Sequence, residues 1–276
     1  MSILRRIIEK LPIFKRMSQV YLRRKRSVGS LEEKLKLAKS WSWKMTEFSN
    51  YYYALTPRNR KDLAFLISHI FNEPLEIVES YFAEIENDST VNRILREFRN
   101  KNEQLRDSSM EIGRRIGWYA IVRIQKPRLV VETGVHHGVG ALVINSALLM
   151  NRNEGYFGNY LGTDINPESG ELITNTYSPF AEIVIGDSIT TLQNLDKTID
   201  IFINDSDHSS EYEGREYSVI SNKLSENAVI LGDNCHASDS LRIFSAENNR
   251  HFVFFKEEPL NHFYLGAGIG ISFRNN

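Results

Sequence analysis

The chain has 276 residues, of which 41% are hydrophobic and 25% charged, and its formal net charge is −1 at pH 7. This balance excludes the disordered and collagen-like classes and is typical of a globular protein with a substantial buried core. The single cysteine, Cys235, excludes an intrachain disulfide framework, and no signal-peptide pattern is visible, so we expect a cytoplasmic protein.

Positive charge is concentrated at the amino terminus. Residues 1 to 26 contain nine Lys or Arg and one acid, Glu9, which gives +8 and leaves −9 for the remainder. Apolar residues lie between these charges, as in a basic amphipathic helix, so peripheral contact with the inner face of an anionic membrane is one expectation. Packing on the rest of the protein or on a second subunit is the other, and a homo-oligomer is expected. Nucleic acid is not an expected partner, because the rest of the chain is acidic.

Residues 31 to 125 show the apolar spacing of helices. Thr56 followed by Pro57 predicts a helix start, because the hydroxyl can cap the first amides and proline has no amide to satisfy. The helix is predicted to direct inward Leu63, Phe65, Leu66 and Ile70. Pro74 is predicted to open another helix. We therefore predict a helical region over residues 1 to 110, acting as a cap or dimerisation element, and a second domain over residues 111 to 276.

From about residue 128, short apolar runs alternate with helical stretches, which is typical of βαβ units in a parallel sheet. The predicted strands are residues 129 to 133, 160 to 164, 182 to 186, 199 to 204, 228 to 232, 252 to 255 and 268 to 273. The segment between the last two is too short for a crossover helix, so the seventh strand is predicted antiparallel to its neighbour. The predicted fold class is α/β, a doubly wound seven-stranded sheet.

A glycine turn follows the first predicted strand and contains Gly134, Gly138 and Gly140. It fits both the T-G-x-x-x-G-x-G loop of a dehydrogenase and the E-x-G-x-x-x-G loop of a methyltransferase. A short-chain dehydrogenase also needs a Tyr-x-x-x-Lys pair downstream, and the only such pair here, Tyr21 with Lys25, lies upstream. A lone glycine pattern is weak evidence, so an NAD-binding dehydrogenase is kept only as an alternative.

Acidic residues lie at the ends of five predicted strands or directly after them, where ligands of open α/β sheets bind. They are Glu132, Asp164, Asp187, Asp205 with Asp207, and Asp233.

Residues 110 to 273 resemble the class I S-adenosylmethionine-dependent methyltransferases, and among them the small O-methyltransferases of the catechol and macrocin type. The resemblance rests on the order of the segments "VVETGVHHGVGA", "YLGTDI", "AEIVIGDSITTL", "DIFINDSDHSSEYEGREY", "AVILGDNCHASDSL" and "GAGIGISF". It implies S-adenosylmethionine as cofactor and a hydroxyl of a small molecule, sugar or glycan precursor as acceptor. It does not identify the acceptor.

The resemblance implies a set of cofactor-binding residues: Glu132, Gly134, Gly138, Asp164, Asp187, Ser188 and Asp205. Adenosylmethionine offers a ribose diol, an adenine amine and an ammonium as donors, which carboxylates can accept. We expect Asp164 at the ribose and Asp187 near the adenine, with Glu132 supporting the turn or the ammonium. For each acid the alternative is a helix cap, most of all for Asp187 before "SITTL".

The metal-dependent branch of this family implies a magnesium site. Asp205, Asp233 and Asn234 would be its ligands, and all three offer the oxygen atoms that magnesium or another divalent cation requires. The sequence "NDSDHS" departs from the family pattern Asp-Gly-Asp-His, so either Asn204 or Asp205 could point into the site. The insertion "NRNEGYFGNY" before the second strand is a further departure.

Two histidines follow these acids and are candidate general bases, because imidazole titrates near neutral pH. We favour His208, with Asp205, as the catalytic pair over His236. A metal-independent methyltransferase that uses His208 alone, and a non-catalytic binding protein of the same fold, stay open as alternatives. No spacing typical of a zinc site is present.

Overall fold

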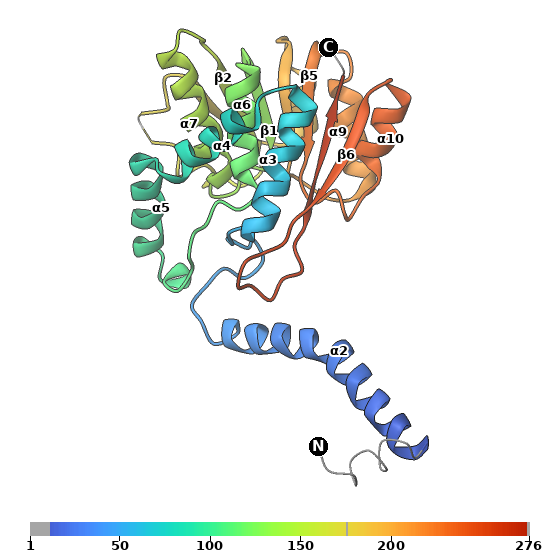
Figure 1. Ribbon diagram of the computed structural model, residues 1–276. Coiled ribbons are helices and arrows are strands. Elements are labelled where there is room, and N and C mark those ends of the chain that lie inside the picture. The colour runs from blue at the N-terminus through green and yellow to red at the C-terminus, as the bar shows by residue number, and fades with distance from the viewer. Residues whose placement is uncertain (1–11, 175, 275–276) are drawn as a thin grey trace. The chain divides into compact units, whose positions relative to one another are not determined.

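The computed structural model describes residues 12–174 and 176–274 (Figure 1). Contacts divide the chain into two compact units: Met1–Lys44 with Asn261–Tyr264, and Met45–Leu260 with Leu265–Asn276. Residues 1–11 of the predicted basic segment lie outside the described residues.

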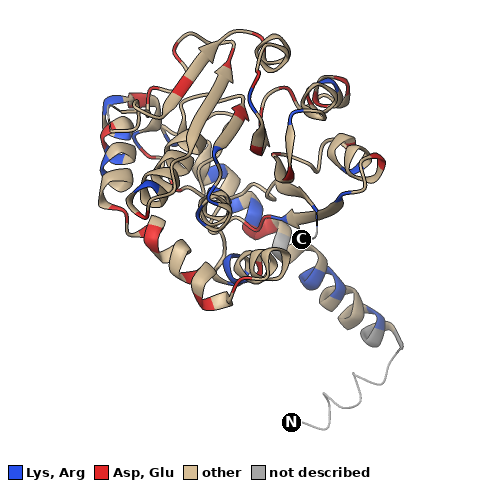
Figure 2. Ribbon diagram, turned by 90° about the horizontal axis from the view of Figure 1, so that it is seen from above, with Lys and Arg blue, Asp and Glu red and all other residues tan. Residues whose placement is uncertain are grey.

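The first unit is built on one long helix, α2 (Pro12–Trp41). Lys34 donates a hydrogen bond from Nζ to the carbonyl of His262 at 2.8 Å, and the rings of Trp41 and Phe263 lie 4.8 Å apart between centroids. Residues 16–27 of α2 are exposed, and Figure 2 shows its Lys and Arg residues in blue. In the described part of the chain, no helix is both long and apolar enough to span a membrane.

Three helices precede the sheet in the second unit: α3 (Pro57–Phe71), α4 (Leu75–Glu86) and α5 (Ser89–Lys101). The predicted start at Thr56 is confirmed, because its side chain accepts a hydrogen bond from the amide of Asn59 at 3.2 Å. Pro74 occupies the cap position of α4, as predicted. A short 3₁₀ helix, η1 (Glu103–Leu105), follows α5.

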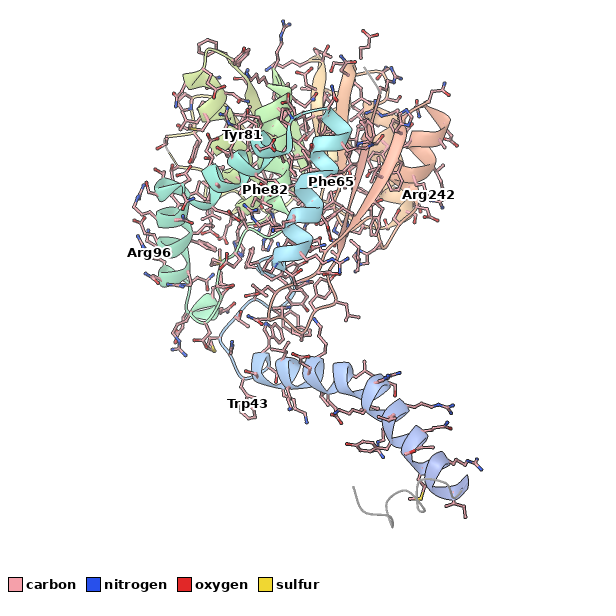
Figure 3. All side chains as sticks on the ribbon, viewed as in Figure 1. Trp43, Phe65, Tyr81, Phe82, Arg96 and Arg242 are labelled. Atoms are coloured by element: carbon pink, nitrogen blue, oxygen red, sulfur yellow. The ribbon has the colours of Figure 1, made fainter. Side chains whose placement is uncertain are left out.

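The predicted inward face of α3 is only partly correct. Leu63 is buried, and Leu66 and Ile70 are half-buried, but Phe65 is 66% exposed (Figure 3). Residues two positions apart on a helix differ by about 200°, so Phe65 lies opposite Leu63. The helix instead buries Ala64 and Ile67 with Leu63.

The seven predicted strands are confirmed, with shifts of a few residues at their ends. They are β1 (Leu129–Thr133), β2 (Asn159–Asp164), β3 (Ala181–Ile185), β4 (Ile199–Asn204), β5 (Leu224–Gly232), β6 (His251–Lys256) and β7 (Gly268–Phe273). The sheet order is β3-β2-β1-β4-β5-β7-β6, and β7 is antiparallel to both neighbours, as predicted.

The remaining helices cover the two faces of this sheet. They are α6 (Arg115–Gln125), α7 (Val139–Asn153), α8 (Ser188–Gln193), α9 (Ser210–Ile220) and α10 (Ser240–Glu247). The strand order reverses between β1 and β4, so right-handed crossovers place α7 on one face and α8 and α9 on the other. Helices α3, α4 and α6 pack with one another and α6 with α7, while α10 packs against α9 (Figure 1).

The strand register brings the carboxyl ends of the central strands to one edge. Thr133 is paired with Thr163 of β2 and with Asn204 of β4, and Asn204 is paired with Gly232 of β5. Acids that lie far apart in the sequence are therefore neighbours at this edge. Helices α3 to α5 belong to the same compact unit as the sheet. The division at residue 110 and the cap or dimerisation role stay predictions.

Candidate active site

The glycine turn after β1 is held by close backbone approaches. Gly134 has φ +83, and a Cβ built on it would lie 2.0 Å from the carbonyl oxygen of Asp205. The amide of Gly134 donates to the carbonyl of Thr163 at 2.9 Å, and the amide of Asp205 donates to that of Thr133 at 2.9 Å. The turn therefore lies between the ends of β2 and β4 and is hydrogen-bonded at both sides, and only glycine fits at position 134.

The acid at the end of β2 is bonded to this turn. Asp164 accepts hydrogen bonds from the amide of His136 at 2.7 Å and from the amide of Asn166 at 2.8 Å. The Asp164 carboxylate thus orders the turn, and the residue also lines the cavity described below.

The acid after β3 caps a helix, which was the alternative kept for it. Asp187 accepts from the amide and the hydroxyl of Thr190, both at 2.8 Å, and from the hydroxyl of Tyr212 at 2.8 Å. The Thr190 amide and these hydroxyls hold the pKa of Asp187 below its usual value. The carboxylate is therefore ionised at neutral pH and fixed in place.

A cavity of about 510 Å³ lies at this edge, within the usual size range of small-molecule sites. Five residues predicted to bind the cofactor line it: Gly134, Asp164, Asp187, Ser188 and Asp205. Tyr212 and His136 also line it and were not among the predicted cofactor residues. Glu132 and Gly138 are not among its lining residues.

Glu132 instead lies buried behind the turn. It accepts a hydrogen bond from the Tyr160 hydroxyl, and a Cβ on Gly140 would lie 2.4 Å from its Oε1. Burial raises its pKa to about 7, against the opposing effect of the Tyr160 hydroxyl. Gly138 has φ +92 and caps α7. Both residues therefore shape the turn from outside the cavity.

A second buried acid supports the strand ends from the other face of the sheet. Glu216 of α9 accepts hydrogen bonds from four residues: Thr133 (3.2 Å), Ser206 (2.9 Å), Ser188 and Asn204. Burial raises its pKa to about 7, although those hydrogen bonds lower it. Asn204 is thus turned towards Glu216, and Asp205 is the residue that faces the cavity.

Next to the cavity, Asp205, His208 and Asp233 converge. One ligand atom from each lies within 4.8 Å of the others. His208 Nε2 lies 3.7 Å from Asp205 Oδ1, and the amide nitrogen of Asn234 donates to His208 Nε2 at 2.9 Å and to Asp233 Oδ2 at 3.2 Å. All four predicted catalytic and metal residues therefore meet, and Asp205 belongs to both cavity and cluster.

The two carboxylates of this cluster have opposite titration behaviour. Burial and the neighbouring charge of Asp233 raise the pKa of Asp205 well above its usual range. Burial is the largest single effect on Asp233 and would raise its pKa, but the charge of Arg114 together with hydrogen bonds from Arg114 and Asp205 lowers that pKa overall. Of the two, Asp233 is the residue whose ionised form is favoured, and Asp205 is the residue whose protonated form is favoured.

Arg114 was missed by the sequence reasoning. It donates a hydrogen bond to Asp233 Oδ2, and its Nε lies 3.7 Å from Glu257 Oε1. Tyr53 donates from its hydroxyl to Glu257 at 2.7 Å. A buried arginine therefore takes one oxygen of Asp233, while the other, Oδ1, is buried without a partner among the described residues.

His208 is the better placed of the two candidate bases. Its Nδ1 lies 3.6 Å from Oε1 of Glu213, a carboxylate with 0% exposure, and this close contact raises the pKa of His208. Burial lowers the pKa of His236. Because the Asn234 amide donates to Nε2, the proton of a neutral His208 is on Nδ1, and Nε2 is its basic atom.

Residues 131–235 match a protein-family model described as a methyltransferase domain. This part of the chain is similar to a methyltransferase domain. No curated protein matches the chain in a sequence comparison. Its fold is that of the class I S-adenosylmethionine-dependent methyltransferases, as the resemblance implied.

Solved structures of O-methyltransferases share the fold of this chain. An O-methyltransferase from Bacillus cereus in complex with SAH has 14% identity and a TM-score of 0.52, over 68% of this chain and 92% of that one. TomG from Streptomyces achromogenes, an O-methyltransferase of tomaymycin synthesis in complex with SAM, has 13% identity and a TM-score of 0.51, over 69% and 91%. The SAH-bound methyltransferase PaMTH1 from Podospora anserina has 16% identity and a TM-score of 0.50, over 68% and 88%.

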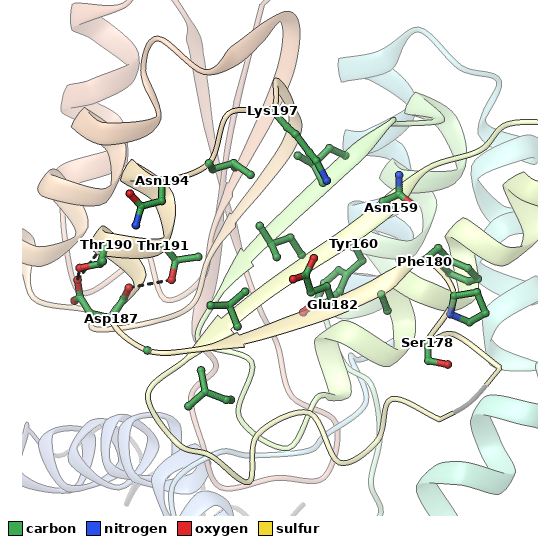
Figure 4. Close-up of a pocket in the computed structure, with 18 residues that line it drawn as sticks. Asn159, Tyr160, Ser178, Phe180, Glu182, Asp187, Thr190, Thr191, Asn194 and Lys197 are labelled. Carbon is green, nitrogen blue, oxygen red and sulfur yellow. Dashed lines mark hydrogen bonds between the residues drawn. The ribbon is translucent and has the colours of Figure 1, made fainter.

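A larger hollow, of about 670 Å³, lies over β1, β2 and β3 (Figure 4). The hollow is lined by apolar side chains such as Leu161 and Val184 and by the charged residues Glu182 and Lys197. Apart from Asp187, none of the predicted site residues lines it. The smaller cavity at the glycine turn is therefore the better candidate for the reaction.

Proposed function

We propose that the protein is an S-adenosylmethionine-dependent O-methyltransferase that acts on a hydroxyl of a small molecule, sugar or glycan precursor. The observation that carries the proposal is Asp205, which lines the cavity at the glycine turn and also belongs to the cluster with His208 and Asp233. A cofactor in the cavity would thus have its reactive end beside groups that can bind and deprotonate an acceptor.

In this proposal the cofactor lies along the strand ends. The Asp164 carboxylate accepts the ribose hydroxyls, and Asp187 with Ser188 faces the adenine, at the start of α8. Gly134 leaves room for the cofactor to approach the backbone of the turn. Asp164 and Asp187 already accept backbone amides, so they are held rigid before the cofactor binds.

A divalent cation such as Mg²⁺ fits the cluster. Asp205, Asp233 and Asn234 would hold it through oxygen atoms, since Asp233 Oδ1 is buried without a partner among the described residues and Asp205 is poorly stabilised as an anion. When bound, the cation would stabilise the alkoxide form of the acceptor.

The chain's own residues then complete methyl transfer. When the acceptor hydroxyl displaces the Asn234 amide from His208 Nε2, this atom takes the proton of the hydroxyl, and Glu213 stabilises the resulting imidazolium from Nδ1. The acceptor oxygen forms a bond to the methyl carbon as the carbon–sulfur bond of the sulfonium breaks, leaving S-adenosylhomocysteine.

The observation that favours a metal-independent alternative is the contact between Arg114 and Asp233. This guanidinium already supplies one positive charge to the cluster. In that mechanism His208 acts alone as the base, and the acids position the acceptor.

Replacing Asp164 with alanine should weaken binding of S-adenosylhomocysteine by about 1.5–3 kcal/mol, the scale of hydrogen bonds to a charged group. Titration calorimetry on the folded protein measures this effect. Asp196→Ala, an exposed position away from the strand ends, is the control and should leave affinity unchanged. Equal affinity of the two variants, or tight binding of NADH by the wild type, would contradict the assignment.

We further propose that α2 contacts an anionic membrane surface. Ile13, Met17, Val20 and Tyr21 are exposed at helical spacing, and the run from Arg23 to Arg26 is exposed beside them. Each basic side chain near such a surface contributes about 1 kcal/mol.

This contact predicts that the full chain co-sediments with vesicles containing phosphatidylglycerol at low salt, and is released at about 1 M salt, where charges are screened beyond about 3 Å. Reversing the charge of residues 23–26 to glutamate should abolish co-sedimentation. Vesicles of phosphatidylcholine alone are the control. Equal retention on both kinds of vesicle, or no retention on either, would lead us to abandon the membrane contact.

A further inference from the structure

The first residue of α6, Arg115, is a buried guanidinium without a polar partner. Its side chain is 4% exposed, and its Nε is buried with no hydrogen bond to any described residue. Its one described contact is with an aromatic ring, since Cζ lies 5.6 Å from the centroid of Trp118. Burying a charge in this way costs several kcal/mol unless an anion accompanies it.

The other buried arginines of the described chain are all paired. Arg114 contacts Asp233 and Glu257, Arg123 contacts Glu84 and Glu154, and Arg250 donates to Ser272 and to the Ala228 carbonyl. Arg114, the residue before Arg115, contacts two carboxylates, whereas Arg115 contacts an aromatic ring. The missing partner is therefore a property of this position and not of buried arginines in the fold.

Arg115 stands close to the glycine turn. A Cβ on Gly140, in the first turn of α7, would lie 2.9 Å from Cζ3 of Trp118, the ring that Arg115 contacts. The charge of Arg115 favours the ionised forms of the nearby acids, Asp233 and Glu257 among them, but no hydrogen bond or ion pair joins Arg115 to an acid in the described residues. Burial raises the pKa of both Glu132 and Asp205, and the charge of Arg115 opposes the rise in each.

A second unpartnered polar group belongs to the same region. Tyr52 is 3% exposed, and its hydroxyl has no hydrogen-bond partner in the described residues. Burial raises its pKa to about 12, and the charge of Arg115 opposes this rise. Two residues earlier, Asn50 contacts His136 of the turn, at 3.3 Å between Nδ2 and Nδ1. A donor and a cation thus lie unpaired beside the proposed cofactor cavity.

We propose that Arg115 and Tyr52 bind a ligand carboxylate, and that this carboxylate is the one on the methionine end of adenosylmethionine. A guanidinium forms two parallel hydrogen bonds with a carboxylate, and a buried hydroxyl can donate a third. The amino end of α6 adds favourable electrostatics for an anion. This inference rests on the proposed function, because it needs a cofactor in the cavity at the glycine turn.

The test compares adenosylmethionine with decarboxylated adenosylmethionine, which lacks only the carboxylate, by titration calorimetry. The wild type should prefer adenosylmethionine by about 10- to 100-fold. In Arg115→Met this preference should disappear, with affinity for the decarboxylated ligand changed by less than about two-fold. Arg115→Lys should keep part of the preference. Tyr52→Phe should reduce it, whereas Tyr53→Phe, whose hydroxyl donates to Glu257, should not.

Thermal unfolding of the unliganded protein gives an independent readout. Removing an unpaired buried charge should leave the midpoint of Arg115→Met unchanged or higher. A lower midpoint together with equal loss of affinity for both ligands would show a structural role and overturn the proposal. If the wild type binds neither ligand, the proposed function itself fails.

An acidic acceptor is the other source of a carboxylate. Binding of 3,4-dihydroxybenzoate and of catechol to the wild type and to Arg115→Met distinguishes it. Unchanged affinity for adenosylmethionine, with a lost preference for the benzoate, would keep the carboxylate site but assign it to the acceptor. If neither preference changes in the variant, Arg115 binds no carboxylate.

Discussion

Replacing Asp233 with asparagine is expected to abolish methyl transfer and to lower the free energy of unfolding by about 3–5 kcal/mol, the scale for breaking a buried ion pair. Asp233 is 1% exposed and is the partner of Arg114, so the variant leaves a buried guanidinium with only Glu257, 3.7 Å away. It also removes one anionic ligand from the cluster with Asp205 and His208. Methyl transfer to a panel of phenols and glycosides, with denaturant unfolding, measures both effects.

The matched control is Asp239→Asn. Asp239 also pairs with an arginine, Arg242, but its side chain is 69% exposed, so the change should cost less than about 1 kcal/mol and leave activity intact. A chelator separates the two mechanisms, because it should inactivate the wild type only if a metal takes part. Activity that survives both the chelator and the substitution of Asp233 would reject the metal site while leaving the methyltransferase class in place.

Replacing Gly134 with alanine is expected to lower the free energy of unfolding by about 2–5 kcal/mol and to remove measurable cofactor binding. The added Cβ would lie 2.0 Å from the carbonyl oxygen of Asp205, and φ is +83. Left-handed backbone costs an alanine about 1–2 kcal/mol, and forcing the strand ends apart costs about 1–3 kcal/mol more. Denaturant unfolding and calorimetry with S-adenosylhomocysteine are the measurements.

Gly155→Ala isolates the backbone term. Gly155 has φ +91, but nothing lies within 4 Å of its Cβ position. Its cost should therefore be about 1–2 kcal/mol, with no effect on cofactor binding. Equal costs at both positions would mean that the strand ends move apart without penalty, and that the close approach of Gly134 to Asp205 has no energetic role.

The sheet could be predicted because each strand is a short apolar run that ends at an acid or a turn residue. The reversal of β7 followed from a connection too short for a crossover helix. The inward face of α3 was predicted less well, because Phe65 is apolar and yet exposed. Helical spacing places side chains relative to one another, whereas the neighbouring helices decide which face is covered.

Site residues at strand ends could be predicted because parallel strands bring their carboxyl ends to one edge. Arg114 and Arg115 could not, since their roles depend on where the start of α6 meets β5 and on which carboxylates lie nearby. The sequence favoured Asp205 but did not exclude that Asn204 points into the site instead. Alternation along β4 and the position of Glu216 on α9 decide between them, and α9 packs there only in the folded chain.

The end of β1 has a buried carboxyl group on each of its two faces, Glu132 on one and Glu216, bonded to Thr133, on the other. Both have a pKa raised from 4.5 to about 7, so the folded chain binds more protons than the unfolded chain between these values, and stability falls as the pH rises through that window. Near neutral pH each group is only partly protonated. When a ligand changes the electrostatic potential at the glycine turn, Glu132 and Glu216 will therefore take up protons from the solution or release protons to it. The heat of binding will then include the ionisation of the buffer, and an enthalpy becomes specific to the protein only when measured in two buffers of different ionisation heat.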